Sequence, residues 1–510
     1  MSGTHRPLYG LSGRDTNIHS THAMRYLSLL GALPLILCVL GSSGCATNPV
    51  SGGSDFVLMS EEQEIALGRK YSAEIIKDMP LYEDPELAKR VQAIGEQVAA
   101  SSHRPELIYR FAVLDSTDVN AFALPGGYIY ITRGLLAYLN TEAELAAVLG
   151  HEIGHVTARH SVRQHSTATA AGLVAAVLGA ASGVQGADTL ANMVGTAIVR
   201  GYGREHELEA DRLGAEYLAK TGYDPDAMLE IIGILKHQEE FEKLRAEKED
   251  REPKAYHGLF SSHPENDKRL QEVVKAAHSH KSGSTTRINR TGFMQALEGL
   301  TFGDSETEGI VRDNHFYHKE LDFAVSFPQG WRIENRSDKI IAMPAANDGL
   351  VQLSISDRNK RISAQEFMIK RLGLKDLERG EPVSSQGLTG YTAVASSKTP
   401  YGTRPVRYVV LYRDQKAYIF AGAAKDKKSP TGYEQEILAT AHSFHALGQD
   451  EKMLANEAKI HLIRASTGTR YRDLAGSSPI ANYPEEQLRL LNGHYPDGEP
   501  RPGDLIKIVR

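Results

Sequence analysis

The segment HEIGH, residues 151–155, places two histidines four residues apart, with a glutamate directly after the first. On an α-helix, positions i and i+4 lie on one face, so both imidazoles can reach one metal ion at about 2 Å, the distance that zinc requires. Glu152 would then lie beside a water molecule at the metal and act as general base. The alternative is a pair of ordinary helix histidines, because a bare His-Glu-x-x-His pattern also occurs by chance.

A second stretch, "YGREHELEADRLGAEYLA" at residues 202–219, places Glu207 and Asp211 four residues apart. A catalytic zinc needs three protein ligands and an open position, and Glu207 can supply the third ligand. Asp211 can accept a hydrogen bond from the ring of a ligating histidine and so fix its tautomer. Glu209 is the alternative third ligand, but only Glu207 has Asp211 one turn further along the same helical face.

The elements that must position these residues can be predicted from the surrounding pattern. Thr141 and Glu144 form a Ser/Thr-x-x-Glu capping box, and apolar residues then recur at helical intervals, which predicts a helix with one buried face. The preceding "NAFALPGGYIYITRG" is typical of strand, turn and strand. We expect an edge strand that pairs with an extended substrate, formed by Asn120, Ala121, Phe122 and Ala123. The alternative is a purely structural hairpin.

Four motifs together resemble a known family: HEIGH, the Glu-x-Glu-Ala-Asp at 207–211, "SSHPENDKR" at 261–269 and "DVNAFALPGGYIYITRGLL" at 118–136. They are similar to the gluzincins that include the HtpX proteases and the CAAX prenyl endopeptidases, peptidase family M48. The likeness covers about residues 50–280. It implies a mainly α-helical zincin domain with one Zn²⁺ held by His151, His155 and Glu207, and with Glu152 as general base.

Two further residues are candidates for roles beside the metal. Arg204 and His263 could each donate to the oxyanion of the reacting carbonyl. Gly203 stands where the family often has a serine, which departs from the pattern next to Arg204. For His263 a second hypothesis is a latch, in which the imidazole takes the open metal position. The third hypothesis is that His263 is an ordinary surface histidine before Pro264.

The N-terminal residues predict export and lipid attachment. Residues 24–45, "MRYLSLLGALPLILCVLGSSGC", have the basic start, short apolar run and small residues of a signal peptide, which we place at 1–44 with a start at Met1 or Met24. Cys45 resembles the lipidated cysteine of bacterial lipoproteins, although Ser42 stands where leucine is usual. The alternatives are a plain cleaved signal and an uncleaved anchor. Ala46 after the cysteine favours the outer membrane.

Length and composition indicate an α+β multidomain chain. With 510 residues we expect two to four domains, and the net charge of −6 gives no electrostatic reason to expect nucleic acid. Cys38 and Cys45 are the only cysteines, which excludes a disulfide framework in the remainder. We predict a protease domain at 45–280, a linker at 281–309, an α+β accessory domain at 310–446 and a small module at 457–510. The Ala/Gly/Val-rich residues 169–199 are too interrupted for a membrane hairpin and favour packing helices.

The 457–510 module has the predicted order strand, helix, helix, strand. It resembles a LysM peptidoglycan-binding module in "STGTRYRDLA", "LRLLNG" and "PGDLIKIV". The usual Gly-Asp-Thr is replaced by Gly468, Thr469 and Arg470, so glycan binding stays open.

Together these features predict a zinc endopeptidase on the periplasmic side of the bacterial envelope. The resemblance implies misfolded or misassembled envelope proteins as substrates, the membrane as a partner through the lipid, and peptidoglycan as a further candidate partner. One alternative is an envelope binding or chaperone lipoprotein with weak or latent protease activity. Another is peptidoglycan hydrolysis.

Overall fold

The computed structural model describes residues 45–169, 203–249, 251–253, 267–278, 286–336, 338–358, 360–426 and 432–510. The chain divides into two compact units, one of Met1–Glu64 and Arg159–Val199, the other of Ile65–Ala158 and Arg200–Arg510. The predicted signal peptide at 1–44, residues 170–199 of the Ala/Gly/Val-rich stretch and His263 lie outside the described residues. Within the described part, no helix combines the length and apolar character needed to cross a bilayer.

The first unit contains a small hairpin and a helical segment. Strands β1 (Cys45–Thr47) and β2 (Ser54–Phe56) pair antiparallel, and residues 160–169 are helical. The Ser166 hydroxyl accepts a hydrogen bond from the Leu58 amide at 2.9 Å, which ties the segment after the hairpin to this helical stretch. A buried ion pair between Arg159 and Glu64, 2.9 Å apart, adds a second link within the unit.

A three-stranded sheet lies beside the candidate metal helix. Its order is β3 (Arg110–Leu114), β5 (Tyr128–Thr132) and β4 (Ala121–Leu124), with β3 parallel and β4 antiparallel to β5. Gly126 and Gly127 make the turn between β4 and β5 with φ of 75° and 86°, values that glycine adopts without strain. The predicted strand, turn and strand are therefore confirmed, and β4 is an edge strand of this sheet.

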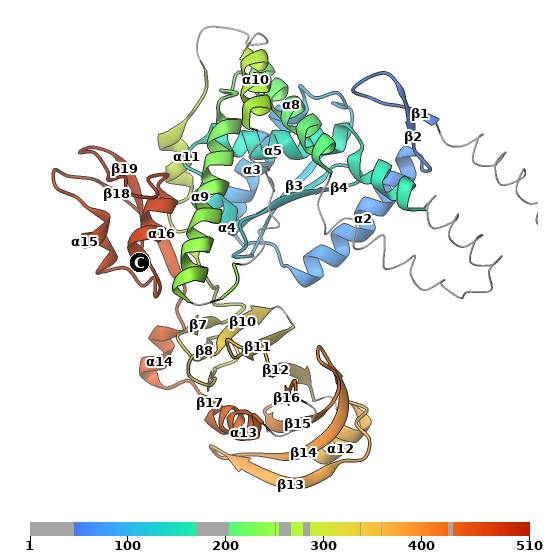
Figure 1. Ribbon diagram of the computed structural model, residues 1–510, viewed down its shortest axis with the longest axis vertical. Coiled ribbons are helices and arrows are strands. Elements are labelled where there is room, and N and C mark those ends of the chain that lie inside the picture. Colours follow the sequence, from blue (N-terminus) through green and yellow to red (C-terminus); the bar gives the residue numbers. More distant parts are fainter. Residues whose placement is uncertain are drawn as a thin grey trace, which may run out of the picture. The chain divides into compact units, whose positions relative to one another are not determined.

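Helices make up the rest of this part of the chain (Figure 1). They are α2 (Glu61–Asp78), α3 (Pro85–Ala99), α4 (Arg133–Tyr138), α5 (Glu142–Thr157), α8 (Arg204–Lys220), α9 (Ala227–Lys248), α10 (Asp267–Ala277) and α11 (Arg290–Ala296). Helix α5 packs against α3, α8 and α9. The predicted helix is confirmed, and its burial extends from one face to every residue of α5. A helix that is covered on all sides needs apolar and small residues around its whole circumference, and "AELAAVLGHEIGHV" supplies them.

The accessory domain contains two antiparallel sheets. One has the order β10 (Arg332–Arg336), β11 (Lys339–Met343), β12 (Gly349–Asp357), β16 (Lys416–Ala424), β15 (Gly402–Arg413), β14 (Leu388–Thr399) and β13 (Glu378–Ser385). The other has the order β17 (His445–Ala446), β9 (Phe323–Ser326), β8 (His315–His318) and β7 (Ile310–Arg312).

Two helices cover opposite faces of the seven-stranded sheet. Helix α13 (Glu434–Ser443) packs its Ile437 against Val409 and Phe420, whereas α12 (Ala364–Lys370) packs its Phe367 against Val410. Adjacent residues of a strand point to opposite faces, so Val409 and Val410 belong to different cores. The accessory domain therefore has two hydrophobic layers, one on each face of a single sheet.

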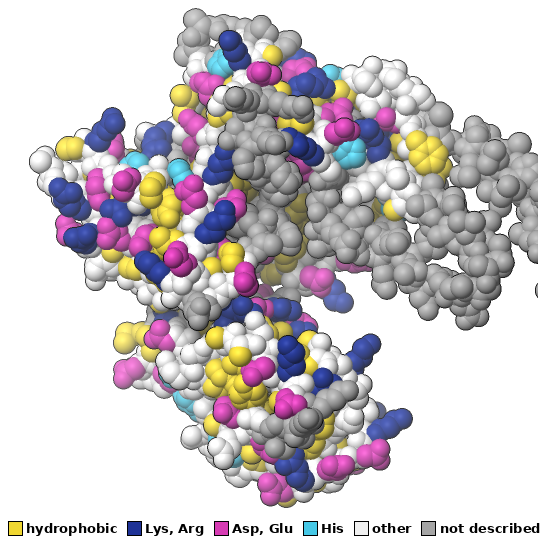
Figure 2. All heavy atoms as spheres, in the orientation of Figure 1, with side chains coloured by type: hydrophobic (Ala, Val, Ile, Leu, Met, Phe, Trp, Pro, Cys, Tyr) yellow, Lys and Arg dark blue, Asp and Glu magenta, His cyan; other side chains and the backbone are white. Residues whose placement is uncertain are grey.

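The C-terminal module consists of β18 (Ala458–Arg464), α15 (Tyr471–Ala475), α16 (Pro484–Leu491) and β19 (Leu505–Val509), and follows α14 (Gln449–Leu454). Strand β18 pairs antiparallel with β19 on one side and with β6 (Thr301–Phe302) on the other. Helix α16 packs on α4 and α9, and β19 packs on α11. The module thus shares a sheet and several helix contacts with the segment that carries the metal helix. Over the face shown in Figure 2, acidic and basic side chains are interspersed.

Candidate metal centre

Helices α5 and α8 approach each other closely at small residues. A Cβ atom added at Gly154 would come within 2.8 Å of the Ala210 carbonyl oxygen. A Cβ atom at Gly214 would come within 3.0 Å of the His151 amide nitrogen. Both distances are shorter than ordinary contacts, so glycine at these positions permits the two backbones to pack together. This close packing brings the histidines of α5 near the carboxylates of α8.

Three side chains converge at this contact. The Nε2 atoms of His151 and His155 are 2.9 Å apart, and Glu207 Oε2 lies 3.4 Å from the first and 3.8 Å from the second. Both histidines are buried, whereas the Glu207 side chain is 21% exposed. The structure therefore brings together the three residues that the sequence analysis selected as ligands.

The geometry and the donor set fit a zinc ion. Ligands held about 2.0–2.1 Å from a tetrahedral zinc lie about 3.4 Å from one another, and the three separations bracket this value. Glu207 Oε2 is a buried oxygen with no hydrogen-bond donor among the described residues. Two imidazoles and one carboxylate, with a fourth position left over, are also the ligand types that zinc takes in hydrolases.

Asp211 orients the first histidine. Its Oδ1 lies 2.8 Å from His151 Nδ1, which leaves Nε2 directed toward His155 and Glu207. This contact assigns a proton to Nδ1, so metal binding needs to displace a proton only from Nε2, the atom that would bind the metal. The structure thus places Asp211 against a histidine of the HEIGH segment, where the sequence analysis expected it.

The electrostatic environment favours an ionised third ligand. Burial opposes ionisation of Glu207, but the favourable interactions with the nearby His151 and His155 rings outweigh it and lower the pKa of the carboxyl. Burial also lowers the pKa of His151, yet contacts with Asp211 and Glu207 raise it overall to about 10. Glu207 is consequently a carboxylate at neutral pH, as a metal ligand must be.

Glu152 lies in a different environment from Glu207. Burial raises its pKa to about 7, and the charge of His151 and a backbone hydrogen bond from Ala123 only partly oppose this shift. A carboxyl group with a pKa near 7 can both accept and release a proton at neutral pH. The contact with Ala123 also places Glu152 beside the edge strand β4. The sequence favoured a strand beside this helix, but it gave no signal for the contact between Ala123 and Glu152, which are 29 positions apart with α4 between them.

The remaining predicted site residues are placed as follows. Asn120 precedes β4 and is half-buried, and Phe122 is half-buried between the buried Ala121 and Ala123. Arg204 is the exposed first residue of α8, one turn before Glu207. Roles for these residues in binding substrate or the oxyanion stay predictions, as do lipidation at Cys45 and both hypotheses for His263.

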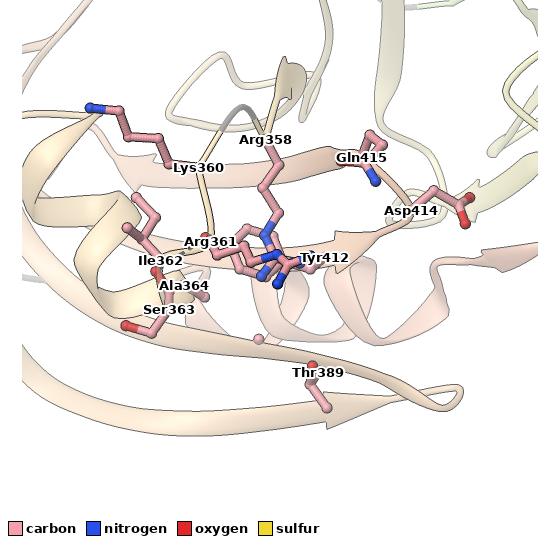
Figure 3. A pocket seen from close by; sticks show the side chains of 11 residues that line it. Arg358, Lys360, Arg361, Ile362, Ser363, Ala364, Thr389, Tyr412, Asp414 and Gln415 are labelled. Atoms are coloured by element: carbon pink, nitrogen blue, oxygen red, sulfur yellow. Dashed lines mark hydrogen bonds between the residues drawn. The ribbon is translucent and has the colours of Figure 1, made fainter.

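The accessory domain holds a separate hollow of about 770 Å³. Arg358, Lys360 and Arg361 line it together with one carboxylate, that of Asp414. Figure 3 shows Arg358 directed toward Tyr412, and its guanidinium carbon lies 4.0 Å from the centre of that ring. None of these residues belongs to the metal centre, and the hollow has a positive charge.

Comparison with known proteins identifies the class of the segment that carries the metal centre. Residues 85–277 match the model described as Peptidase family M48. This segment includes α5, α8 and all three converging side chains, and the match supports a metalloendopeptidase. The family part of the resemblance is thus supported, whereas the narrower HtpX or CAAX type stays a prediction.

Particular relatives share this segment. The chain is 34% identical over 176 residues to a putative beta-barrel assembly-enhancing protease from Vibrio cholerae, covering 33% of this chain and 36% of the relative. It is 28% identical over 248 residues to the beta-barrel assembly-enhancing protease of Yersinia pestis, and this match covers 46% of this chain and 48% of the relative. It is also 28% identical over 191 residues to metalloprotease LoiP of Escherichia coli, and this match covers 37% of this chain and 69% of the relative. The chain therefore spans less than half the length of the first two relatives.

Proposed function

We propose that this chain is a zinc-dependent endopeptidase of the bacterial envelope, attached to the membrane by lipid at Cys45. The observation that carries the proposal is the convergence of His151, His155 and Glu207, with separations of 2.9, 3.4 and 3.8 Å. The match of residues 85–277 to peptidase family M48 supports the same activity. We further propose misfolded or misassembled envelope proteins as substrates, in agreement with relatives whose names refer to β-barrel assembly.

The reaction would depend on a few residues with distinct tasks. A bound zinc supplies Lewis-acid polarisation of the scissile carbonyl and makes water more acidic. The Glu152 carboxylate accepts the proton of the attacking water and donates it to the leaving amine, which its pKa of about 7 permits. Asp211 holds the His151 ring through Nδ1 at 2.8 Å.

Strand β4 supports the choice of an extended peptide as substrate. It is the edge of the β3-β5-β4 sheet, and Ala123 in this strand donates a backbone hydrogen bond to Glu152. A substrate that pairs with β4 would bring its backbone beside the general base without selecting particular side chains. Extended segments are available in unfolded proteins and are rare in compact ones, which favours misfolded substrates.

The test combines metal analysis with casein digestion. We expect one zinc per chain, loss of cleavage when a chelator removes the metal, and recovery when zinc is added. Glu152→Gln should retain zinc and lose about 10²–10⁴-fold in rate, because Gln cannot accept the proton. A purified chain without zinc, or cleavage by Glu152→Gln at the wild-type rate, would contradict the proposal and favour a binding or chaperone role.

A further inference from the structure

A lysine of the C-terminal module is buried against the segment that precedes the metal helix. The side chain of Lys507 in β19 is 0% exposed. Its Nζ donates to the carbonyl oxygens of Ala137 at 2.5 Å and Leu139 at 2.9 Å. These two carbonyls end α4, and α5 begins three residues after Leu139. Burying an ammonium group costs several kcal/mol unless it is well paired, so this geometry requires a compensating partner.

A buried carboxyl group of opposite charge lies in the first turn of the metal helix, close enough to interact with Lys507 electrostatically but without a direct ion pair. Glu144 is buried, and its Oε2 accepts from the Asn140 amide at 2.5 Å. Its own amide donates to the Thr141 hydroxyl at 3.1 Å, the helix cap that the sequence predicted. The expected return bond of a capping box, from the Thr141 amide to Glu144, is replaced by the bond from Asn140. Burial raises the pKa of Glu144 to about 7 and lowers that of Lys507 to about 7, while the opposite charges attract.

The lysine is itself held at a fixed position. The Asn492 side chain accepts from the Lys507 amide at 2.7 Å and donates to the Lys507 carbonyl at 2.8 Å. The side-chain amide of Asn492 also donates to the Leu488 carbonyl at 2.8 Å, which connects β19 to α16. Strand β19 in turn pairs with β18 along five residues. The module is therefore a rigid support for the Nζ atom.

We propose that Lys507 is a positioning residue of the metal centre, through which the C-terminal module fixes the N-terminal end of α5. The proposal rests on the proposed zinc function. Glu144 and His151 are seven residues apart on one helix, about 10 Å at 1.5 Å per residue. Glu207 comes from α8, so a shift of α5 changes the distances between the histidines and this carboxylate. Without Lys507, the turn before α5 would lose two hydrogen bonds, and Glu144 would lose the attraction of a buried cation.

The test uses full-length variants and measures zinc affinity, amide hydrogen exchange and steady-state kinetics. Lys507→Met removes the charge and keeps the length of the side chain. We expect zinc affinity about tenfold lower, by comparison with 10–100-fold for residues that touch a ligand directly. We also expect faster exchange over residues 144–155 and a lower kcat with little change in KM. The matched control is Lys459→Met in β18, whose side chain is 47% exposed and pairs with Glu457.

A double variant separates positioning from a general loss of stability. Adding Glu144→Gln to Lys507→Met removes the uncompensated charge and keeps the acceptor for the Asn140 amide, so zinc affinity should return to within about threefold of wild type. If Lys507→Met fails to fold, the single variant Glu144→Gln tests the proposal instead. It removes the negative charge that acts on Lys507 and should therefore also weaken zinc binding.

Wild-type zinc affinity, exchange and kcat per folded molecule in these variants, with only a lower unfolding temperature, would overturn the proposal. Zinc affinity and exchange can be measured without any cleavage. A wild-type chain that binds zinc and cleaves nothing would therefore count against the protease and still decide the role of Lys507.

Discussion

Asp211 shows how one carboxylate beside the metal ligands can control them. It contacts His151 Nδ1 at 2.8 Å and belongs to the same helix as Glu207. Asp211→Asn should lower zinc affinity by about 10–100-fold, because the amide no longer favours the tautomer and orientation that the imidazole needs. Competition with a coloured chelator measures this change. Glu209→Gln on the same helix is the control and should bind zinc as tightly as the wild type; a loss there would reopen the choice between Glu207 and Glu209.

His318 in the accessory domain should make stability depend on pH. Burial lowers its pKa to about 4, and its Nδ1 accepts a hydrogen bond from the Leu321 amide at 3.3 Å. A folded pKa below the unfolded value of about 6.5 means that the unfolded chain binds the proton first. The contribution is complete above about pH 6.5 and is lost as the pH falls toward 4, by at most about 3 kcal/mol.

His318→Asn keeps an acceptor near the Nδ1 position and cannot take up this proton. Thermal unfolding between pH 7 and pH 4 should therefore show a smaller acid loss for the variant than for the wild type. Parallel pH curves for the two proteins would show that His318 is not responsible.

The contact between α5 and α8 is the critical feature at the scale of elements. Gly154→Ala would place a methyl group 2.8 Å from the Ala210 carbonyl, which is backbone and cannot rotate away. We expect a loss of about 1–3 kcal/mol in the free energy of unfolding, together with weaker zinc binding as the helices separate. Denaturant titration and zinc competition measure the two effects.

Helix α9 offers a matched substitution. Nothing lies within 4 Å of a Cβ atom at Gly233, so Gly233→Ala should stabilise the chain by up to about 1 kcal/mol through helix propensity alone. Equal effects of the two substitutions would mean that the close helix contact does not matter.

The elements also show where sequence patterns are informative. Regular apolar spacing and the Thr141 cap predicted α5, and Ser363 caps α12 as its pattern suggests. The hairpin of β13 and β14 was missed, because "ERGEPVSSQGLTGYTAVASSKT" is polar, contains glycines and a proline, and forms the end of its sheet, where strands are largely exposed. Such residues match a loop as well as a strand until a neighbouring strand is known.

Local spacing selected the candidate metal ligands, because His151 and His155 lie one helical turn apart and Glu207 lies one turn from Asp211. Spacing alone could not reveal the role of Lys507, because a lysine between apolar residues is common in a strand. The partners of its Nζ are 368 and 370 residues away in the chain. Contacts of this kind depend on how separate elements pack, and no short pattern encodes them.

At the scale of the whole molecule, aromatic side chains join the C-terminal module to α9, in addition to the contact of Lys507 with the end of α4. The Phe241 ring lies 6.1 Å from that of Tyr495 and 6.0 Å from that of Tyr483, both nearly perpendicular. Edge-to-face pairs of this type contribute about 0.5–1.5 kcal/mol beyond the area that they bury. A double-mutant cycle of Phe241→Ala and Tyr495→Ala should give a coupling energy in this range.

The control cycle combines Phe241→Ala with Tyr401→Ala. Tyr401 lies within the accessory domain, where its hydroxyl donates to the Gly349 carbonyl. These two substitutions should be additive in the free energy of unfolding within about 0.5 kcal/mol. Additivity in the first cycle as well would show that the module and α9 are energetically independent.

The pairing of β6 with β18 has a consequence for synthesis. The two strands begin at residues 301 and 458, so the whole accessory domain must be translated between them. At about 5–20 residues per second, the 368 residues from Leu139 to Lys507 take roughly 20–70 seconds. During most of that interval a nascent chain already contains the two candidate zinc-binding histidines but not the lysine that we propose positions their helix. The order of the chain itself would thus delay the maturation of a hydrolytic enzyme until most of the polypeptide has been made.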